Sequence, residues 1–246
     1  MSGDGLRKPA HQAHAAPSPG PPAQPADLSA DRGRALALTP VSRETTARLD
    51  RFVEMLLTSQ KRLNLIAAST ESIIWTRHVA DSLQLLPLAA DARIWVDLGS
   101  GAGFPGMVIA CAVAEKAEAR VHLVESTGKK AAFLREAAHA TGAPATVHAV
   151  RIEDFVKTAP EKIDVVTARA LAPLPKLLAL AYPLLKRGAL GLFPKGQDVA
   201  VELTEAAKCW TIDASLAPSR TDPKAQIVVV RALEPKPRSR VMTRPN

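Results

Sequence analysis

Residues 94–106, IWVDLGSGAGFPG, combine a short apolar run, a carboxylate and a cluster of glycines. A short apolar run followed directly by glycines indicates a buried strand that turns tightly into a helix. Glycine is needed there because the backbone takes conformations, or approaches a ligand, that a Cβ would forbid. The loop therefore predicts a site for an adenosine-type cofactor over the end of a parallel strand. Its glycines are Gly99, Gly101, Gly103 and Gly106.

The glycine spacing by itself fits two cofactor classes. Glu125 ends the next apolar segment, where an acid accepts hydrogen bonds from ribose hydroxyls in nicotinamide and S-adenosylmethionine enzymes alike. Asp97 separates the two classes, because a carboxylate at the mouth of the loop repels a pyrophosphate. The same carboxylate tolerates the ammonium and sulfonium of S-adenosylmethionine. We therefore favour S-adenosylmethionine, with a NAD-dependent reductase as the alternative.

The segment Arg151-Ile152-Glu153-Asp154 leaves the third predicted strand. In adenosine-binding sheets this exit lies beside the adenine ring. Ile152 is a candidate for contact with the ring, and Glu153 or Asp154 for contact with its amino group. The plain alternative is a strand exit with solvated charges.

Arg169 and Lys195 leave the fourth and fifth predicted strands at the same edge of the sheet. An arginine emerging from a buried apolar strand needs a partner, because an unpaired buried charge is costly. An RNA phosphate or base edge would supply one, and so would a structural ion pair. Lys195 is placed to meet a phosphate in the same way. With Arg151, these are the candidate substrate-side residues.

Arg77, His78 and Asp81 lie within one turn of a predicted helix. Arg77 and Asp81 are i, i+4 neighbours, so the plain expectation is a polar helix face with a modest salt bridge. The functional alternative is a lid over the cofactor or a surface that grips substrate.

Other kinds of catalytic site are missing from the sequence. No Asp/Asn-Pro-Pro-aromatic run follows the fourth predicted strand, which argues against methylation of exocyclic adenine or cytosine amines. Neither cysteine lies in a Pro-Cys turn at that edge, and no cluster has metal-ligand spacing. We expect Cys111 and Cys209 to be small buried apolar residues of a cytoplasmic protein. We expect His122 and His148 to be packed or edge residues of strands.

Strands and helices alternate from residue 93 onward, which predicts an α/β fold. We expect a Rossmann-like, mostly parallel seven-stranded sheet with an antiparallel strand, preceded by an N-terminal helical extension. The predicted strands are 93–98, 120–125, 145–150, 162–168, 189–193, 210–216 and 226–233. The predicted helices begin at residue 42 and after Ser69-Thr70, the second running to about Leu86, and continue near 106–117, 128–140, 173–187 and 197–208.

These residues together resemble the glucose-inhibited division protein B family, the 16S ribosomal RNA guanine-N7 methyltransferases. The resemblance covers about residues 48–231. Its ordered matches are Leu63-Asn64-Leu65, Arg77-His78, Asp81-Ser82-Leu83, Asp97 to Gly106, Lys129-Lys130, Phe133-Leu134, Arg151-x-Glu153, Arg169-Ala170 and Lys195-Gly196. Three positions depart from it, because Glu125 replaces the family's usual Asp, and Ser59 and Ile66 replace its usual Trp and Thr.

The resemblance implies a set of residues that contact S-adenosylmethionine. They are Gly99, Gly101, Gly103, Phe104, Glu125, Ile152, Glu153 and Arg169. It also implies methyl transfer to N7 of a guanine in the 530-loop region of 16S ribosomal RNA, with the small ribosomal subunit as partner. Guanine N7 carries a lone pair and no proton, so we assign no catalytic acid or base. In-line alignment alone can lower the barrier by roughly 7–11 kcal/mol. A non-enzymatic RNA-binding protein and a small-molecule methyltransferase are the further alternatives.

Composition divides the 246 residues into four parts. We predict a disordered Pro/Ala-rich tail (1–38), the helical extension (39–90), the methyltransferase domain (91–233) and a basic flexible tail (234–246). The net charge of +8 suits a polyanion such as RNA, although a solvated basic terminus explains it equally well. No apolar run approaches the roughly 20 residues of a membrane span. We expect a cytoplasmic monomer without a metal.

Overall fold

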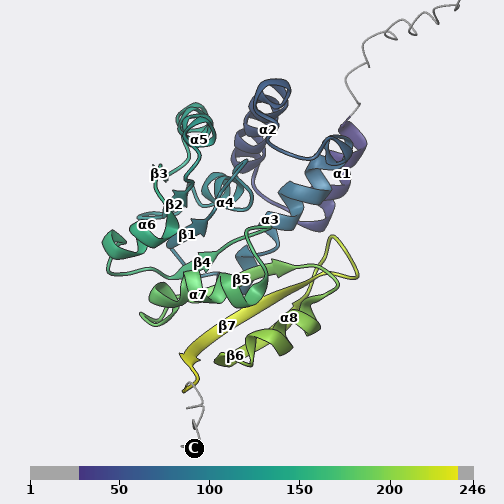
Figure 1. The fold of residues 1–246 in the computed structure, drawn as a ribbon. Coiled ribbons are helices and arrows are strands. Elements are labelled where there is room, and N and C mark those ends of the chain that lie inside the picture. Colours follow the sequence, from purple (N-terminus) through teal and green to yellow (C-terminus); the bar gives the residue numbers. More distant parts are fainter. Residues whose placement is uncertain (1–27, 238–246) are drawn as a thin grey trace, which may run out of the picture.

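The computed structural model describes residues 28–237 (Figure 1). A seven-stranded sheet has the order β3-β2-β1-β4-β5-β7-β6, and β7 alone runs antiparallel to its neighbours β5 and β6. This confirms the predicted sheet with its antiparallel strand. The strands are β1 (Ile94–Leu98), β2 (Arg120–Val124), β3 (Ala145–His148), β4 (Val165–Thr167), β5 (Leu190–Lys195), β6 (Trp210–Pro218) and β7 (Gln226–Pro235).

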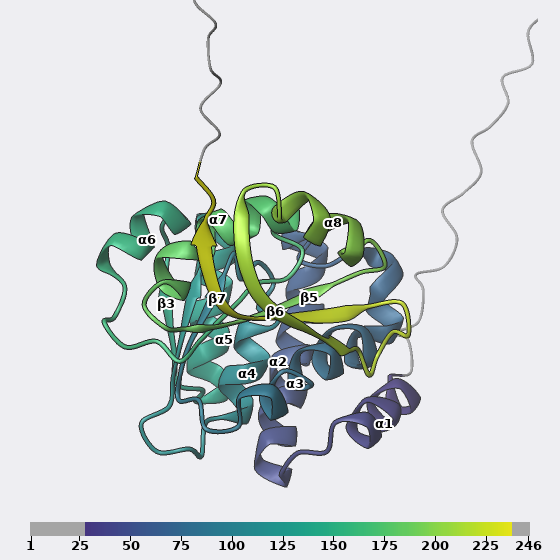
Figure 2. The same cartoon turned by 90° about the horizontal axis from the view of Figure 1, so that it is seen from below.

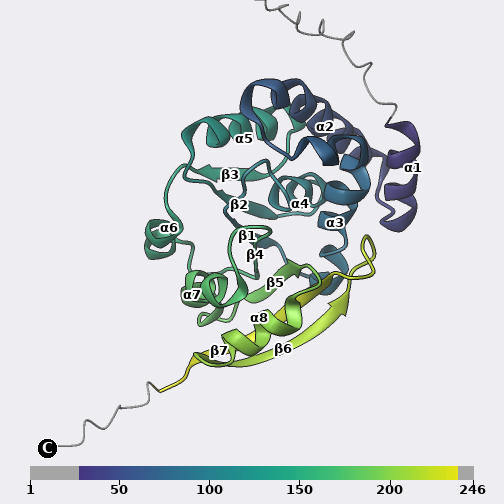
Figure 3. The same cartoon turned by 45° about the vertical axis from the view of Figure 1, so that its right-hand side comes forward.

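Helices cover both faces of the sheet. Successive residues of a strand point to opposite faces, and both faces carry buried apolar side chains that the helices cover. Trp95 of β1 packs toward α2, α4 and α5, whereas the next residue, Val96, packs toward α6, α7 and α8. Figure 3 shows these two layers of helices on either side of the strands. The helices are α1 (Ser29–Leu38), α2 (Arg43–Leu63), η1 (Ala68–Ile73), η2 (Trp75–Ala80), α3 (Asp81–Leu83), η3 (Leu86–Ala89), α4 (Gly106–Ala112), α5 (Gly128–Thr141), α6 (Ile152–Thr158), α7 (Leu174–Leu185) and α8 (Val199–Ala206).

Helix α1 corrects the prediction that residues 1–38 form a disordered tail. Asp31 of α1 is only 2% exposed. Its carboxylate accepts hydrogen bonds from the backbone amides of Trp75 (2.8 Å) and Thr76 (3.2 Å) and from the Thr76 hydroxyl (2.5 Å). Figure 2 shows α1 on the opposite side of the molecule from β3 and α6. Residues 1–27 lie outside the described residues, so disorder there stays a prediction.

The prediction of a single helix between Thr70 and Leu86 is also wrong. The chain instead passes through the 3₁₀-helix η1, the π-helix η2, the short α3 and the 3₁₀-helix η3. The Asp31 carboxylate takes two backbone amides, those of Trp75 and Thr76, that a regular helix would bond to its own carbonyls. A contact from 44 residues away in the chain therefore sets the local helix type.

Smaller differences occur elsewhere in the chain. Residues 152–158 form helix α6, which the sequence reading took as a strand exit. Strand β7 reaches Pro235 and so enters the segment predicted as a flexible tail, of which residues 238–246 lie outside the described part. Cys111 is buried as expected, but Cys209 is exposed. Between residues 28 and 237, none of the helices has the length and apolar character of a membrane span.

The buried carboxylate of Asp31 generates a stability prediction. Asp31→Ala leaves two backbone amides without their charged acceptor and should lower the free energy of unfolding by roughly 2–3 kcal/mol. Asp50→Ala is the matched control, because Asp50 pairs with Arg32 at a half-exposed site and such pairs contribute less than about 1 kcal/mol. Urea unfolding of the three proteins measures the difference, and equal losses for both variants would contradict the assignment.

A histidine pair on β2 and β3 generates a pH prediction. His122 Nδ1 lies 3.0 Å from His148 Nε2. Burial, followed by the neighbouring charges of His148 and Arg120, lowers the pKa of His122 to about 4. The unfolded chain protonates this group near pH 6.5 while the folded chain does not, so stability falls as the pH drops from 6.5 toward 4. Between pH 7 and 5, the free energy of unfolding of the His122→Asn variant should fall less than that of the wild-type protein. The exposed His139→Asn should behave like the unchanged protein in the same urea titrations.

Candidate active site

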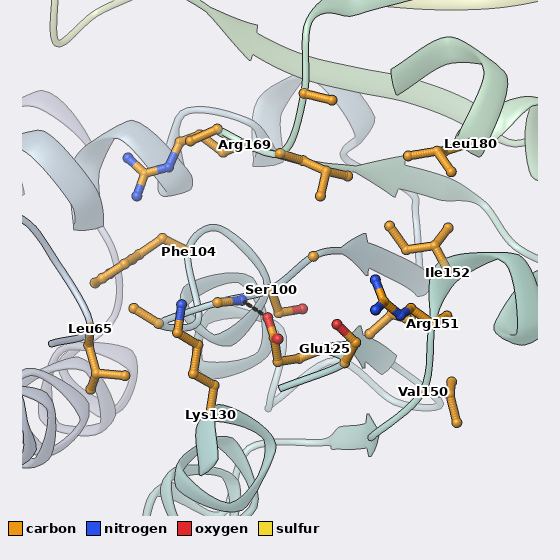
Figure 4. Close-up of a pocket in the computed structure, with 18 of the residues that line it drawn as sticks. Leu65, Ser100, Phe104, Glu125, Lys130, Val150, Arg151, Ile152, Arg169 and Leu180 are labelled. Atoms are coloured by element: carbon orange, nitrogen blue, oxygen red, sulfur yellow. Dashed lines mark hydrogen bonds between the residues drawn. The ribbon is translucent and has the colours of Figure 1, made fainter. Parts of the chain in front are cut away.

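A cavity of 480 Å³ opens at the carboxyl ends of β1, β2 and β4, within the usual size range of small-molecule sites. Figure 4 shows Phe104 and Arg169 at one end, Val150 and Ile152 at the other, and Glu125 between them. Of the predicted cofactor residues, Gly99, Gly101, Phe104, Glu125, Ile152, Glu153 and Arg169 line it. Gly103 does not.

The glycine loop uses its glycines for two different purposes. Gly101 has φ +55°, and a Cβ on it would meet nothing closer than the Gly99 carbonyl oxygen at 3.8 Å. That position therefore leaves open space beside the cavity. Gly103 has φ +100°, and a Cβ there would come within 2.9 Å of the Phe52 ring and 3.2 Å of Leu134. Gly103 therefore allows α2 and α5 to pack against the loop.

Asp97 lies beneath the loop rather than at its mouth, where the sequence reading placed it. The residue is 1% exposed, and its Oδ2 accepts a hydrogen bond from the Gly106 amide at 3.1 Å. Its Oδ1 has no hydrogen-bond partner among the described residues. Burial raises the pKa of Asp97 to about 6, although the Gly106 hydrogen bond opposes this shift. Asp97 therefore fixes the start of α4 and places a buried carboxyl under the cavity floor.

Glu125 holds the loop against β2. One carboxylate oxygen accepts a hydrogen bond from the Gly101 amide at 2.9 Å, drawn dashed in Figure 4, and the other accepts from the Thr127 amide at 2.7 Å. Each oxygen keeps a second lone pair, since a carboxylate has about four acceptor positions. Glu125 can thus accept a hydroxyl of a bound ligand while it fixes the loop.

The end of the cavity near α6 is apolar with a charged rim. Val150, Ile152 and Leu180 line it, and Glu153 stands in the first turn of α6. Arg151 is exposed on the rim and has no side-chain partner within residues 28–237. Asp154 does not line the cavity and forms an exposed ion pair with Lys157 at 2.7 Å.

Arg169 joins the sheet edge to the N-terminal helices. Its guanidinium pairs with the Asp81 carboxylate at 3.1 Å and donates to the Arg77 carbonyl at 3.1 Å and to His78 Nδ1 at 2.6 Å. It also lies 5.4 Å from the centre of the Phe104 ring, a cation–π distance. The structure thus supplies the structural ion pair that the sequence reading left as an alternative, and Arg169 still lines the cavity.

His78 forms part of the cavity wall and is neutral. Because arginine can only donate, His78 Nδ1 must accept, which puts the ring proton on Nε2, facing the Thr70 hydroxyl at 2.9 Å. Burial, then the charges of Arg169 and Arg77, lowers the pKa of His78 to about 3. Its ring stacks on Phe104 with the ring centres 4.8 Å apart. The expected Arg77–Asp81 salt bridge is absent among the described contacts, because Asp81 pairs with Arg169 instead.

Lys195 lies outside this cavity and does not stand free. Its ammonium pairs with Glu202 at 2.6 Å and donates to the Ala172 carbonyl at 3.1 Å, and the side chain is 11% exposed. It lines a neighbouring cavity of 200 Å³ instead. In the part of the chain that is described, no group of three or more His, Cys, Asp or Glu could hold a metal ion.

Sequence reasoning missed several lining residues, including Leu65, Lys130, Val150, Lys176 and Leu180. Leu65 reaches the cavity because Asn64 ends α2 with φ +48°, a left-handed conformation that asparagine tolerates. The Gln60 side chain then binds the Leu65 amide at 2.8 Å. Leu65 and Lys130 carried a signal in the family matches Leu63-Asn64-Leu65 and Lys129-Lys130, whereas the other lining residues depend on the tertiary fold.

Comparisons with known proteins identify the family of this chain. The model of the family described as rRNA small subunit methyltransferase G matches residues 45–234. A ribosomal RNA small subunit methyltransferase G of Bradyrhizobium sp. (strain BTAi1) is 58% identical over 84% of this chain and 93% of its own length. A Rhodopseudomonas palustris (strain BisB18) protein of the same name is 54% identical over 90% of this chain and 93% of its own length.

Solved structures share the fold at low sequence identity. An O-methyltransferase from Bacillus cereus in complex with SAH has a TM-score of 0.54 at 13% identity, covering 83% of this chain and 98% of its own. TomG from Streptomyces achromogenes, in complex with SAM, has a TM-score of 0.54 at 12% identity, covering 83% and 96%. These likenesses support the fold, and the family follows from the closer relatives. The chain belongs to the rRNA small subunit methyltransferase G family.

Proposed function

We propose that this protein transfers the methyl group of S-adenosylmethionine to N7 of a guanine in 16S ribosomal RNA, within the 530-loop region. The observation that carries the proposal is the 480 Å³ cavity, which joins the glycine loop, Glu125 and Arg169 at one sheet edge in a chain of this family. The basic charge of +8 suits an RNA partner. A cytoplasmic location and a monomeric state belong to the same proposal.

The residues present fit S-adenosylmethionine. The apolar surfaces of Val150, Ile152 and Leu180 suit an adenine ring, and the spare lone pairs of Glu125 suit ribose hydroxyls. Lys130 lines the cavity without a side-chain partner among the described residues, so it can meet the carboxylate of the methionine part. When bound, S-adenosylmethionine supplies an electrophilic methyl group on a positively charged sulfur.

The charge arrangement suits a reaction that moves a positive charge. Methylation of guanine N7 breaks the bond from sulfur to methyl, forms the bond from N7 to methyl, and leaves the positive charge on the purine. His78 stays neutral at physiological pH and so adds no cation beside the sulfur or the base. Arg169 is neutralised by its ion pair with Asp81.

No proton transfer is needed in this step, because N7 attacks with a lone pair and carries no hydrogen. The cavity residues therefore act by position. The Glu125 hydrogen bonds fix the glycine loop, and the stacked rings of His78 and Phe104 form a wall at the Arg169 end. Such alignment contributes at most roughly 7–11 kcal/mol to the lowering of the barrier.

Gly101 provides a direct test of cofactor binding. Gly101→Ala puts a methyl group beside the cavity and should weaken S-adenosylmethionine binding about tenfold or more, measured by calorimetry. Gly142→Ala is a matched control, since Gly142 has a similar φ of +63° with open space around it at the end of α5. The control carries the same backbone strain and should bind normally. Equal affinity of both variants would contradict the placement of the cofactor.

Arg169 provides a test of transfer. Arg169→Glu places a second carboxylate beside Asp81 and should reduce methyl incorporation into unmethylated small ribosomal subunits at least about 100-fold. Arg169→Lys keeps the charge and should retain more activity than the reversal. Arg93 is exposed and precedes β1 at the amino ends of the strands, so Arg93→Glu should leave turnover unchanged. Near-normal transfer by a folded Arg169→Glu protein would remove this residue from the site.

A further inference from the structure

A second cavity of 200 Å³ lies beside the first, and Arg169 and Ala170 line both. It is bounded by η2 and α3, by the end of β5, by the start of β7 and by residues 219–225 between β6 and β7. Figure 3 shows this β6–β7 loop extending toward α3. The second cavity therefore adjoins the Arg169 end of the proposed cofactor site, where a substrate atom has to approach the methyl group.

The wall formed by the β6–β7 loop is fastened to the N-terminal helices. The Thr221 hydroxyl donates to Asp81 Oδ1 at 2.7 Å, and the Arg220 amide donates to Gln84 Oε1 at 2.8 Å. Asp81 is the residue that also pairs with Arg169. One buried carboxylate thus positions the shared arginine and the outer wall of the second cavity together, so this cavity is built rather than incidental.

Some polar side chains of the second cavity already have ion-pair or hydrogen-bond partners within the protein, and others do not. Asp81, Arg169 and Lys195 have their charges paired within the protein. Asp222 is half-buried, and its Oδ1 accepts a hydrogen bond from the Lys224 amide at 2.9 Å. Its Oδ2 has no partner in the described part of the chain. The side chains of Arg77 and Gln226 are likewise without hydrogen bonds among residues 28–237, and both line the cavity.

We propose that the second cavity holds the target guanine base, with the Asp222 carboxylate accepting hydrogen bonds from its N1–H and 2-amino groups. These two donors are adjacent on one edge of guanine, whereas O6 and N7 are acceptors on another edge. A carboxylate matches the donor edge, and the free Arg77 guanidinium matches an acceptor. Adenine presents an acceptor at N1, which would face the carboxylate without a hydrogen bond and be rejected.

The charges in the cavity favour a neutral base over a phosphate as its occupant. Two carboxylates, Asp81 and Asp222, line it, and two of its three cations are already paired. A flat, neutral base can place hydrogen-bond donors against the Asp222 carboxylate and acceptors against the Arg77 guanidinium. With the donor edge at Asp222, the N7 edge is left for the wall at Arg169 and Ala170 that the two cavities share. RNA bases are read in this way when they are unstacked from their helix.

This inference rests on the proposed function and is tested through Asp222→Asn. The asparagine oxygen can still accept from the Lys224 amide, so the loop is preserved, while an amide donor replaces the free oxygen. The expected result is a roughly 10- to 100-fold lower kcat/KM on unmethylated small subunits. Asp213→Asn, on the exposed part of β6, is the matched control and should be unchanged. S-Adenosylmethionine affinity and melting temperature, measured on both variants, should match the unchanged protein.

Small subunits with inosine at the target position sharpen the test, because inosine lacks the 2-amino group. The unchanged protein should discriminate against inosine, and Asp222→Asn should treat inosine and guanosine alike within about twofold. A merely structural Asp222 would lower both rates in parallel, which overturns the inference. Full activity of Asp222→Asn overturns it too, while leaving the proposed function intact. Failure of the unchanged protein to methylate N7 overturns both.

Discussion

The ion pair between the Arg169 guanidinium and the Asp81 carboxylate is the interaction on which the rest of the site depends. It leaves β4 at the carboxyl edge of the sheet and reaches Asp81, His78 and the Phe104 ring, which belong to the N-terminal helices and the glycine loop. A buried charge held in this way is stable only with all partners present, because loss of one leaves the others unpaired. The ion pair therefore ties the helical extension to the sheet, and Arg169 lies in the wall that the two adjoining cavities share.

The unusual N-terminal helices follow from this requirement. Asp31 diverts the amides of Trp75 and Thr76, and the resulting π-helix η2 carries His78 into the cavity wall, one turn before Asp81. The β6–β7 loop closes on the same carboxylate through Thr221. The C-terminal β6–β7 loop thus meets the N-terminal helices at Asp81. The Asp81–Arg169 pair is largely buried and connects the N-terminal helices to the end of β4. The helical extension therefore forms part of the site.

Patterns within one segment could be predicted from the sequence. The glycine loop, Glu125 and the succession of strands along the chain followed from apolar runs and turn residues, and the fold and family were confirmed. Contacts between distant segments could not be predicted. The depth of Asp97, the role of Gly103 in packing against Phe52, the pairing of Lys195 with Glu202 and the folding of residues 29–38 all depend on neighbours far away in the chain. Local composition carries no signal for such partners, so α1 resembled the tail before it.

The central claim is that the cavity beside the glycine loop directs a methyl group to guanine N7. The most direct measurement incubates the purified protein with S-adenosylmethionine labelled in its methyl group and small ribosomal subunits that lack the modification. The RNA is then mapped for N7-methylguanosine by borohydride–aniline cleavage. The account predicts label in 16S ribosomal RNA with one new cleavage position, at a guanine of the 530 loop. Label on another atom or another base, or no label on intact subunits, would contradict it.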